Sequence, residues 1–139
     1  MTTQIVAYLF FDRKCREAME FYQSCLGGEL QIMALKDTPV ATQFPPEAAD
    51  LVMHADLTSG GISLMASDNF DGSPVQTGNQ ISLMISCSSE AELRKYFDAL
   101  SVGGKVVMPV RQEFWGDIYG QLTDKFGIQW QLNFHQAQV

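Results

Sequence analysis

The chain has 139 residues, of which 46% are hydrophobic and 18% charged, and its net charge is −7. This length fits one domain, or two small halves that share a core. The negative charge argues against a nucleic-acid partner, because it repels phosphate backbones. The longest early apolar run, residues 5–11, is too short to span a bilayer and lacks the basic flank of a signal peptide, so we expect no membrane partner.

The first half opens with QIVAYLFF at residues 4–11, whose period-two alternation predicts a strand. Cys15, Ala18, Met19 and Tyr22 then follow helical spacing, and the glycine pair at 27–28 ends the predicted helix, because glycine takes the left-handed cap conformation at little cost. Three further strand candidates follow at 29–36, 51–58 and 61–67.

The cysteines are Cys15, Cys25 and Cys87. They match no zinc-binding spacing and lie within apolar patterns, so we predict reduced, partly buried thiols. Thiols persist in reducing compartments, which favours a cytoplasmic location.

The second half repeats the first at an offset of 76 residues, from Gln4 and Gln80 to Gly27 and Gly103. QISLMISC at 80–87 predicts a strand, and Ser89 with Glu92 forms a capping box at the start of the next helix. Strand candidates follow at 105–108, 117–123 and 128–134. We therefore predict two βαβββ modules, 1–68 and 80–139, joined by a linker at 69–79 into one compact domain. A tandem ferredoxin-like fold is the alternative prediction. We rank it lower, because the sequence predicts three strands after each helix, one more than that fold has there.

Three segments carry a family resemblance: YLFFDRKCREAMEFYQSCLGGEL at 8–30, MHADLTSGGISLMASD at 53–68, and MPVRQEFWGDIYGQLTDKFGIQWQLN at 108–133. In this order they resemble the vicinal oxygen chelate superfamily (glyoxalase I, bleomycin-resistance proteins and extradiol dioxygenases), and more narrowly its PhnB-like branch. The resemblance implies an α+β fold in which curved, mostly antiparallel sheets surround a cavity. It also implies a homodimer.

Side-chain parity assigns the two faces of each predicted sheet. Ile81, Leu83 and Ile85 suit the face that packs on the helix, and Trp130 belongs to the core. The other face is polar and free of carboxylates. It is either the solvated side of a one-sided sheet or, as the resemblance implies, the lining of a pocket. The candidate ligand-binding residues are Tyr8, His54, Met65, Gln80, Ser82, Tyr119 and Gln131, with Arg111 and Trp115 in a loop that could close over them.

Metal-dependent relatives place His, Gln or Glu on the first and last strands of each module. Here the corresponding positions of the first module hold Gln4, Ala7 or Tyr8 on the first strand and Met65, or Leu64 if the hairpin shifts by one, on the last. Those of the second module hold Gln80 or Ser82, and Gln131. Neutral amide oxygens seldom hold a transition ion against water, so we predict neither a metal nor another cofactor. His54 is expected to be a hydrogen-bonded packing residue.

Other catalytic motifs are missing from the sequence. No strand leads into a GxGxG turn, so the methyltransferase label sometimes given to PhnB-like proteins gains no support. Parity places Cys87 on the helix-packed face as an inert thiol. Glu113, Asp117 and Asp124 are expected to be solvated carboxylates in or beside loops.

The leading functional prediction is a protein that binds a small, largely uncharged organic ligand without metal. The alternative is a divalent-metal-dependent lyase, isomerase or dioxygenase of the same superfamily, which the missing His and Glu ligands disfavour. A third class is an interaction module without a ligand. The residues leave open whether any reaction is catalysed and what the ligand is.

Overall fold

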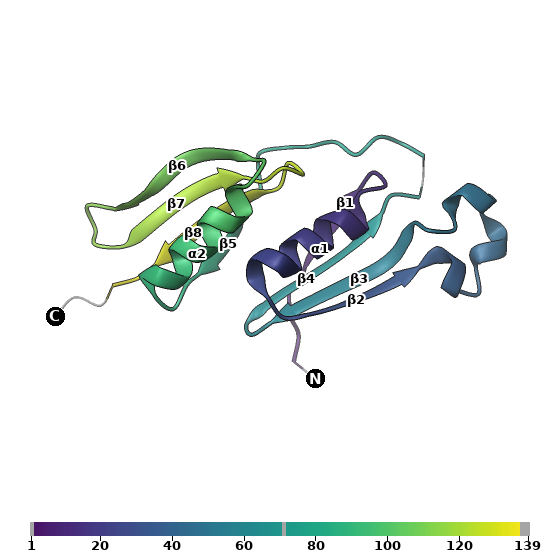
Figure 1. Ribbon diagram of the computed structural model, residues 1–139, viewed down its shortest axis with the longest axis horizontal. Helices are drawn as coiled ribbons and strands as arrows, with labels where there is room; N and C mark the ends of the chain where they lie inside the picture. The colour runs from purple at the N-terminus through teal and green to yellow at the C-terminus, as the bar shows by residue number, and fades with distance from the viewer. Residues whose placement is uncertain (1, 71, 137–139) are drawn as a thin grey trace. The chain divides into compact units, whose positions relative to one another are not determined.

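The computed structural model describes residues 2–70 and 72–136. It forms two compact units, residues 1–76 and 77–139, which are described separately below as unit 1 and unit 2. Within the described residues each unit contains one α-helix and four strands, in the order strand, helix, three strands (Figure 1). The predicted tandem βαβββ arrangement is confirmed.

Unit 1 is a mixed sheet with strand order β1-β4-β3-β2. The first strand lies parallel to the last, and the other neighbours are antiparallel. A stretch of short 3-10 turns joins the second strand to the third. The elements are β1 (Ala7–Phe11), α1 (Cys15–Leu26), β2 (Glu29–Ala34), β3 (Val52–Ser59) and β4 (Ile62–Asp68).

Unit 2 repeats this topology with strand order β5-β8-β7-β6. The parallel pairs correspond: Ala7 is opposite Leu64 in unit 1, and Leu83 is opposite Trp130 in unit 2. The offset of 76 residues therefore relates structurally equivalent positions on the first strands. The elements are β5 (Leu83–Ser86), α2 (Glu90–Ser101), β6 (Lys105–Gln112), β7 (Ile118–Thr123) and β8 (Gln129–Phe134).

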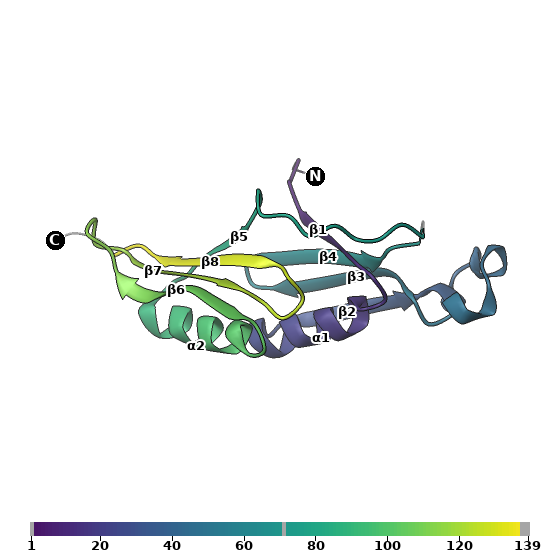
Figure 2. The ribbon, with the colours of Figure 1, turned by 90° about the horizontal axis from the view of Figure 1, so that it is seen from above.

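Each helix packs against one face of its own sheet (Figure 2). The stripe predicted on α1 is confirmed, because all four of its members are inaccessible to solvent. On α2, Leu93, Phe97 and Leu100 are buried and Tyr96 is half-buried. Opposite α2, a Cβ added to Gly120 of β7 would lie 2.8 Å from the ring of Phe97. A glycine at that position lets the helix approach the sheet closely.

The second glycine of each pair has a packing role beyond ending the helix. A Cβ on Gly28 would overlap the carbonyl oxygen of Thr58, and a Cβ on Gly104 would overlap that of Thr123. The same close approach therefore fixes the helix-to-strand connection in both units.

Three local details differ from the sequence prediction. β5 begins only at Leu83, so Ile81 precedes it and is 80% exposed instead of packing on the helix. β6 continues to Gln112, well past the predicted end of that strand. The cap of α2 is shifted: Ser89 Oγ accepts from the Glu92 amide, but the Glu92 carboxylate accepts from the amide of Ser88.

Among the described residues, no helix has the length and apolar character needed to cross a membrane.

Candidate functional site

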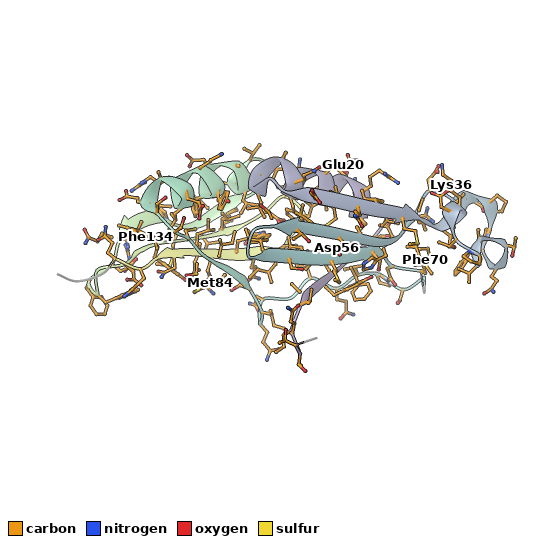
Figure 3. All side chains as sticks on the ribbon, turned by 90° about the horizontal axis from the view of Figure 1, so that it is seen from below. Glu20, Lys36, Asp56, Phe70, Met84 and Phe134 are labelled. Atoms are coloured by element: carbon orange, nitrogen blue, oxygen red, sulfur yellow. The ribbon has the colours of Figure 1, made fainter. Side chains whose placement is uncertain are left out.

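In each unit we call the sheet face opposite the helix the open face. It carries the predicted site residues Tyr8, His54, Met65, Tyr119 and Gln131, whereas Gln80 and Ser82 precede β5. On β8, Trp130 and Leu132 are buried under α2, while Gln129, Gln131 and Asn133 alternate with them and are half-buried. The neighbouring Met84 on β5 is 56% exposed on the open face of unit 2 (Figure 3). The alternation predicted for these strands is therefore present in the fold.

A chain of hydrogen bonds runs across the open face of unit 2. Gln121 Nε2 donates to the hydroxyl of Tyr119 at 2.7 Å, and that hydroxyl donates to Gln131 Oε1 at 2.6 Å. Gln131 Nε2 in turn donates to Ser82 Oγ at 2.5 Å. Three of the predicted residues, Ser82, Tyr119 and Gln131, thus form one connected network, which restrains the rotamers of its members.

The two ends of this network can bond to a further molecule. Ser82 Oγ accepts from Gln131, so its own O–H proton is available to an acceptor. At the other end Gln121 uses its amide nitrogen, which leaves its carbonyl oxygen as an acceptor. The ends therefore present one donor and one acceptor.

A cavity of about 290 Å³ lies next to this network in unit 2. Part of its lining comes from the segment before β5, which Gln129 anchors through a 2.9 Å hydrogen bond from Nε2 to the carbonyl of Gly78. None of the side chains that line the cavity carries a formal charge. They are Asn79, Gln80, Ser82, Val107, Gln121, Leu122, Thr123, Gln129, Trp130 and Gln131.

The open face of unit 1 holds the remaining predicted residues of the strands. Tyr8 and Met65 are direct neighbours on β1 and β4. The hydroxyl of Tyr8 lies 3.2 Å from Nδ1 of His54 on β3, and the two ring centroids are 5.8 Å apart. These three side chains therefore form a local cluster within unit 1.

Arg111 and Trp115 are not among the residues that line the cavity. Arg111 lies on β6 rather than in a loop, is 63% exposed, and pairs with Glu113 at 2.9 Å between Nε and Oε1. Trp115 lies in the turn after β6, where its ring contacts Phe114 edge-on at 4.8 Å. Their predicted role in closing over a ligand stays a prediction.

The expectation of solvated carboxylates was wrong. Asp124 is 3% exposed and accepts the amides of Phe126 and Ile128 on Oδ1 and the indole N–H of Trp130 on Oδ2. It holds the β7–β8 turn together from inside. The side chain of Glu113 is also largely buried, at 9% exposed, beside Arg111.

Asp117 is the third of these carboxylates and is 7% exposed. Asn133 Nδ2 donates to its Oδ2 at 3.0 Å, and His135 Nδ1 lies 2.7 Å from its Oδ1. These hydrogen bonds hold the pKa of the Asp117 carboxyl below its ordinary value, and the bond from Asn133 has the largest effect. The carboxylate ties the β6–β7 turn to the end of β8.

The cysteines are unsuited to nucleophilic chemistry. Cys15, Cys25 and Cys87 are all buried thiols. Burial, and secondarily the charge of Asp68, raises the pKa of Cys15 to about 12. Burial raises the pKa of Cys87 to about 11, with a smaller effect from Glu92. Both thiols stay protonated near neutral pH, whereas the thiolate is the reactive form.

The groups at the ligand-like positions do not suit a divalent metal ion. The parallel strand pairs place Tyr8 beside Met65 and Met84 beside Gln131. Phenol, thioether and amide groups bind such ions weakly without carboxylate or imidazole partners. Within the described part of the chain, no three His, Cys, Asp or Glu side chains come together as a metal site would require.

Sequence reasoning missed two sets of open-face residues. Gln121 and Thr123 continue the alternation that starts at Tyr119, so parity along β7 would have identified them. Asp56 follows His54 by two residues and lies between buried Ala55 and Leu57, so it shares the open face. The expected absence of carboxylates is therefore wrong for unit 1.

Comparison with known proteins identifies the family. A model of the family described as 3-demethylubiquinone-9 3-methyltransferase matches residues 3–133. Among solved structures, protein PA1353 from Pseudomonas aeruginosa is 39% identical, with a TM-score of 0.85 over 98% of this chain and 100% of that one.

A putative 3-demethylubiquinone-9 3-methyltransferase, the PhnB protein from Bacillus cereus, is 27% identical, with a TM-score of 0.76 over 96% of this chain and 100% of that one. Protein YjdN of Escherichia coli K12 is 29% identical over 94% of this chain and 95% of its own length. Glyoxalase/bleomycin-resistance proteins of lower identity share the fold. The chain belongs to the PhnB-like family described as 3-demethylubiquinone-9 3-methyltransferase, and it shares its fold with glyoxalase/bleomycin-resistance/dioxygenase proteins.

Proposed function

We propose that the protein binds a small, uncharged organic molecule in the unit 2 cavity, without a bound metal. The observation that carries the proposal is the network from Gln121 through Tyr119 and Gln131 to Ser82, which borders a cavity of about 290 Å³. Small-molecule sites combine a cavity of about this size with a few fixed polar groups that orient the ligand.

The lining favours a ligand that both donates and accepts hydrogen bonds. Amide side chains such as Gln129 and Gln131 have donors and acceptors, and Val107 and Trp130 add apolar surface. An ion would lose hydration on entering and find no opposite charge on the lining side chains. Alcohols and amides therefore fit this cavity better than acids or amines.

A binding role agrees better with the site than the enzymatic alternative. Proton-transfer catalysis needs a titratable acid or base within reach of the substrate, and the side chains of the cavity lining include no such group. A metal-dependent lyase, isomerase or dioxygenase would need ligands that the donor set does not offer. The methyl transfer in the family's description gains no specific support from the cavity.

The binding test uses a panel of neutral, acidic and basic fragments, screened by saturation-transfer NMR. We expect hits among neutral alcohols and amides, and we expect Gln131→Ala to weaken them while circular dichroism stays native. Gln43→Ala is the matched control, because Gln43 is exposed in unit 1. Binding confined to charged fragments, or equal loss in both variants, would contradict the proposal.

The absence of metal has its own test. Elemental analysis of the purified protein should find no stoichiometric metal, and nickel, zinc, manganese and iron should leave the melting temperature nearly unchanged. A ligand that binds only the native state raises that temperature. One ion bound per chain with micromolar affinity would support the enzymatic alternative.

Two further proposals concern the oligomeric state and the cellular location of the protein. Family resemblance supports a homodimer, which light scattering coupled to size-exclusion chromatography measures directly. The buried thiols support a cytoplasmic location, because such thiols persist where the compartment is reducing.

A further inference from the structure

The open face of unit 1 differs in chemistry from that of unit 2. The strand register places its side chains in rows across the sheet. One row runs from Tyr8 through Met65 and Asp56 to Gln31. In the next row, Phe10 is opposite Ser67 and Met33 is opposite His54. The same face therefore carries a carboxylate, two thioethers and aromatic rings, with Met65 between Tyr8 and Asp56.

The aromatic side chains of this face are exposed and grouped. Tyr8 is 40% exposed and Phe10 58%, and their ring centroids are 5.1 Å apart with the planes tilted by 44°. Tyr8 also contacts His54 at 5.8 Å between centroids. Ring faces are electron-rich, so a group of them attracts a cation.

The charges on this face are negative. Asp56 lies at the centre of its row, and Glu29 lies on the same face of β2, two residues before Gln31. The four strands of unit 1, all of them described, contain no Lys or Arg. Among the described residues, the carboxylate of Asp56 has one weak contact, with Thr58 Oγ1 at 3.5 Å, which leaves it available to a ligand.

We propose that the open face of unit 1 binds an organic cation, a substituted ammonium group. The cation would lie over Met65, with the ring of Tyr8 on one side and the Asp56 carboxylate on the other. Its alkyl groups would contact the thioether and the ring of Phe10, which are polarizable and apolar.

Other ligand charges fit this face less well. An anion would meet two carboxylates and no compensating Lys or Arg. A small hard metal ion prefers several oxygen ligands, whereas the neighbours of Asp56 in its row are a thioether and an amide. This proposal does not depend on ligand binding in the unit 2 cavity.

The test compares choline with its uncharged tert-butyl analogue, which has nearly the same shape. Both are titrated into the protein at about pH 8, above the ordinary range of imidazole protonation, and binding is followed by NMR chemical shifts. We expect choline to bind about tenfold more tightly than the analogue, the size expected for cation–π and carboxylate attraction.

Variants then locate the site. Asp56→Asn and Tyr8→Leu should each weaken choline binding several-fold, and Tyr8→Phe should keep it, because that variant retains the ring. Asp98→Asn is the matched control, since Asp98 is an exposed carboxylate on α2. Circular dichroism checks the fold of each variant.

The result that overturns the proposal is equally specific. If choline binds no more tightly than the uncharged analogue, the positive charge does not contribute to binding and the proposal is wrong. Equal weakening by Asp56→Asn and Asp98→Asn would show a general charge effect rather than a site. Gln131→Ala should leave choline binding unchanged, so failure of this proposal is distinguishable from failure of the unit 2 site.

Discussion

Replacing Asp124 with asparagine should destabilise unit 2 strongly. The carboxylate accepts two backbone amides and one indole N–H at 2.8–3.1 Å, and it is 3% exposed. Asparagine keeps one acceptor oxygen and adds an NH₂ group, which cannot accept. If the oxygen stays with Phe126 and Ile128, the indole of Trp130 faces another donor.

The expected loss follows from these contacts. A hydrogen bond to a charged acceptor contributes about 1.5–3 kcal/mol, and a buried donor left unpaired costs about 1–3 kcal/mol. With one bond lost and two weakened by loss of the charge, Asp124→Asn should lower the free energy of unfolding by roughly 2–5 kcal/mol.

The assay is urea unfolding followed by tryptophan fluorescence. Both tryptophans of the chain, Trp115 and Trp130, lie in unit 2, so their emission reports that unit. The control Asp98→Asn removes an exposed carboxylate from the same unit and should change the free energy by less than about 0.5 kcal/mol. A similarly small change for Asp124→Asn would refute the reasoning.

Three further predictions concern packing, thiol reactivity and pH. Gly120→Ala should lower the free energy of unfolding, measured with urea, by about 1–3 kcal/mol, because the new methyl group overlaps the ring of Phe97. In a chain that also carries Phe97→Leu, the same change at Gly120 should lower the free energy of unfolding by less. Cys15, with its pKa raised to about 12 by burial, should react with an aromatic disulfide reagent only after denaturation; rapid reaction of the native protein would contradict this. The pKa of Asp117 is lowered, chiefly by the hydrogen bond from Asn133. The ionised carboxylate should therefore stabilise the fold at pH values above the ordinary carboxyl range, and this stabilisation should be lost as the pH falls through the lowered pKa. Asp117→Asn should therefore flatten the acid side of the stability profile, and an unchanged profile would show that the carboxylate is not involved.

The order of elements was predictable from the sequence because it depends on local periodicity. The apolar stripe on α1 needs only positions three and four apart, and the glycine pairs mark where each helix ends. The face assignment of β8 followed in the same way, since Trp130 alternates with Gln129 and Gln131.

Burial of the carboxylates was harder to predict because it depends on partners brought together by the fold. Asp117 contacts Asn133 and His135, which lie sixteen and eighteen residues away. Asp124 is different, because two of its donors lie within four residues, as in turns where an aspartate binds the following amides. That signal was present in the sequence and was missed.

The exposure of Ile81 shows the limit of parity. An alternating pattern fixes which side a residue would take if the strand included it, but not where the strand begins. β5 pairs with β8 only from Leu83, opposite Trp130, so the residues before Leu83 are outside the sheet. Parity therefore predicted which strand residues lie on the polar face, but it did not predict the residue at which the strand begins.

The parallel pairing of each first strand sets the order in which a sheet can be completed. In unit 1 the short connection after Ser59 lets β3 and β4 form a hairpin early. By contrast, β1 can pair only after β4, the last strand of this unit to be synthesised, has formed. In the described part of the chain, β1 and β5 each pair with one strand, whereas β3 and β7 each pair with two, so the amides of β1 and β5 should exchange with solvent first. Because β1 carries Tyr8, a molecule held by that side chain would also slow the opening of the strand added last.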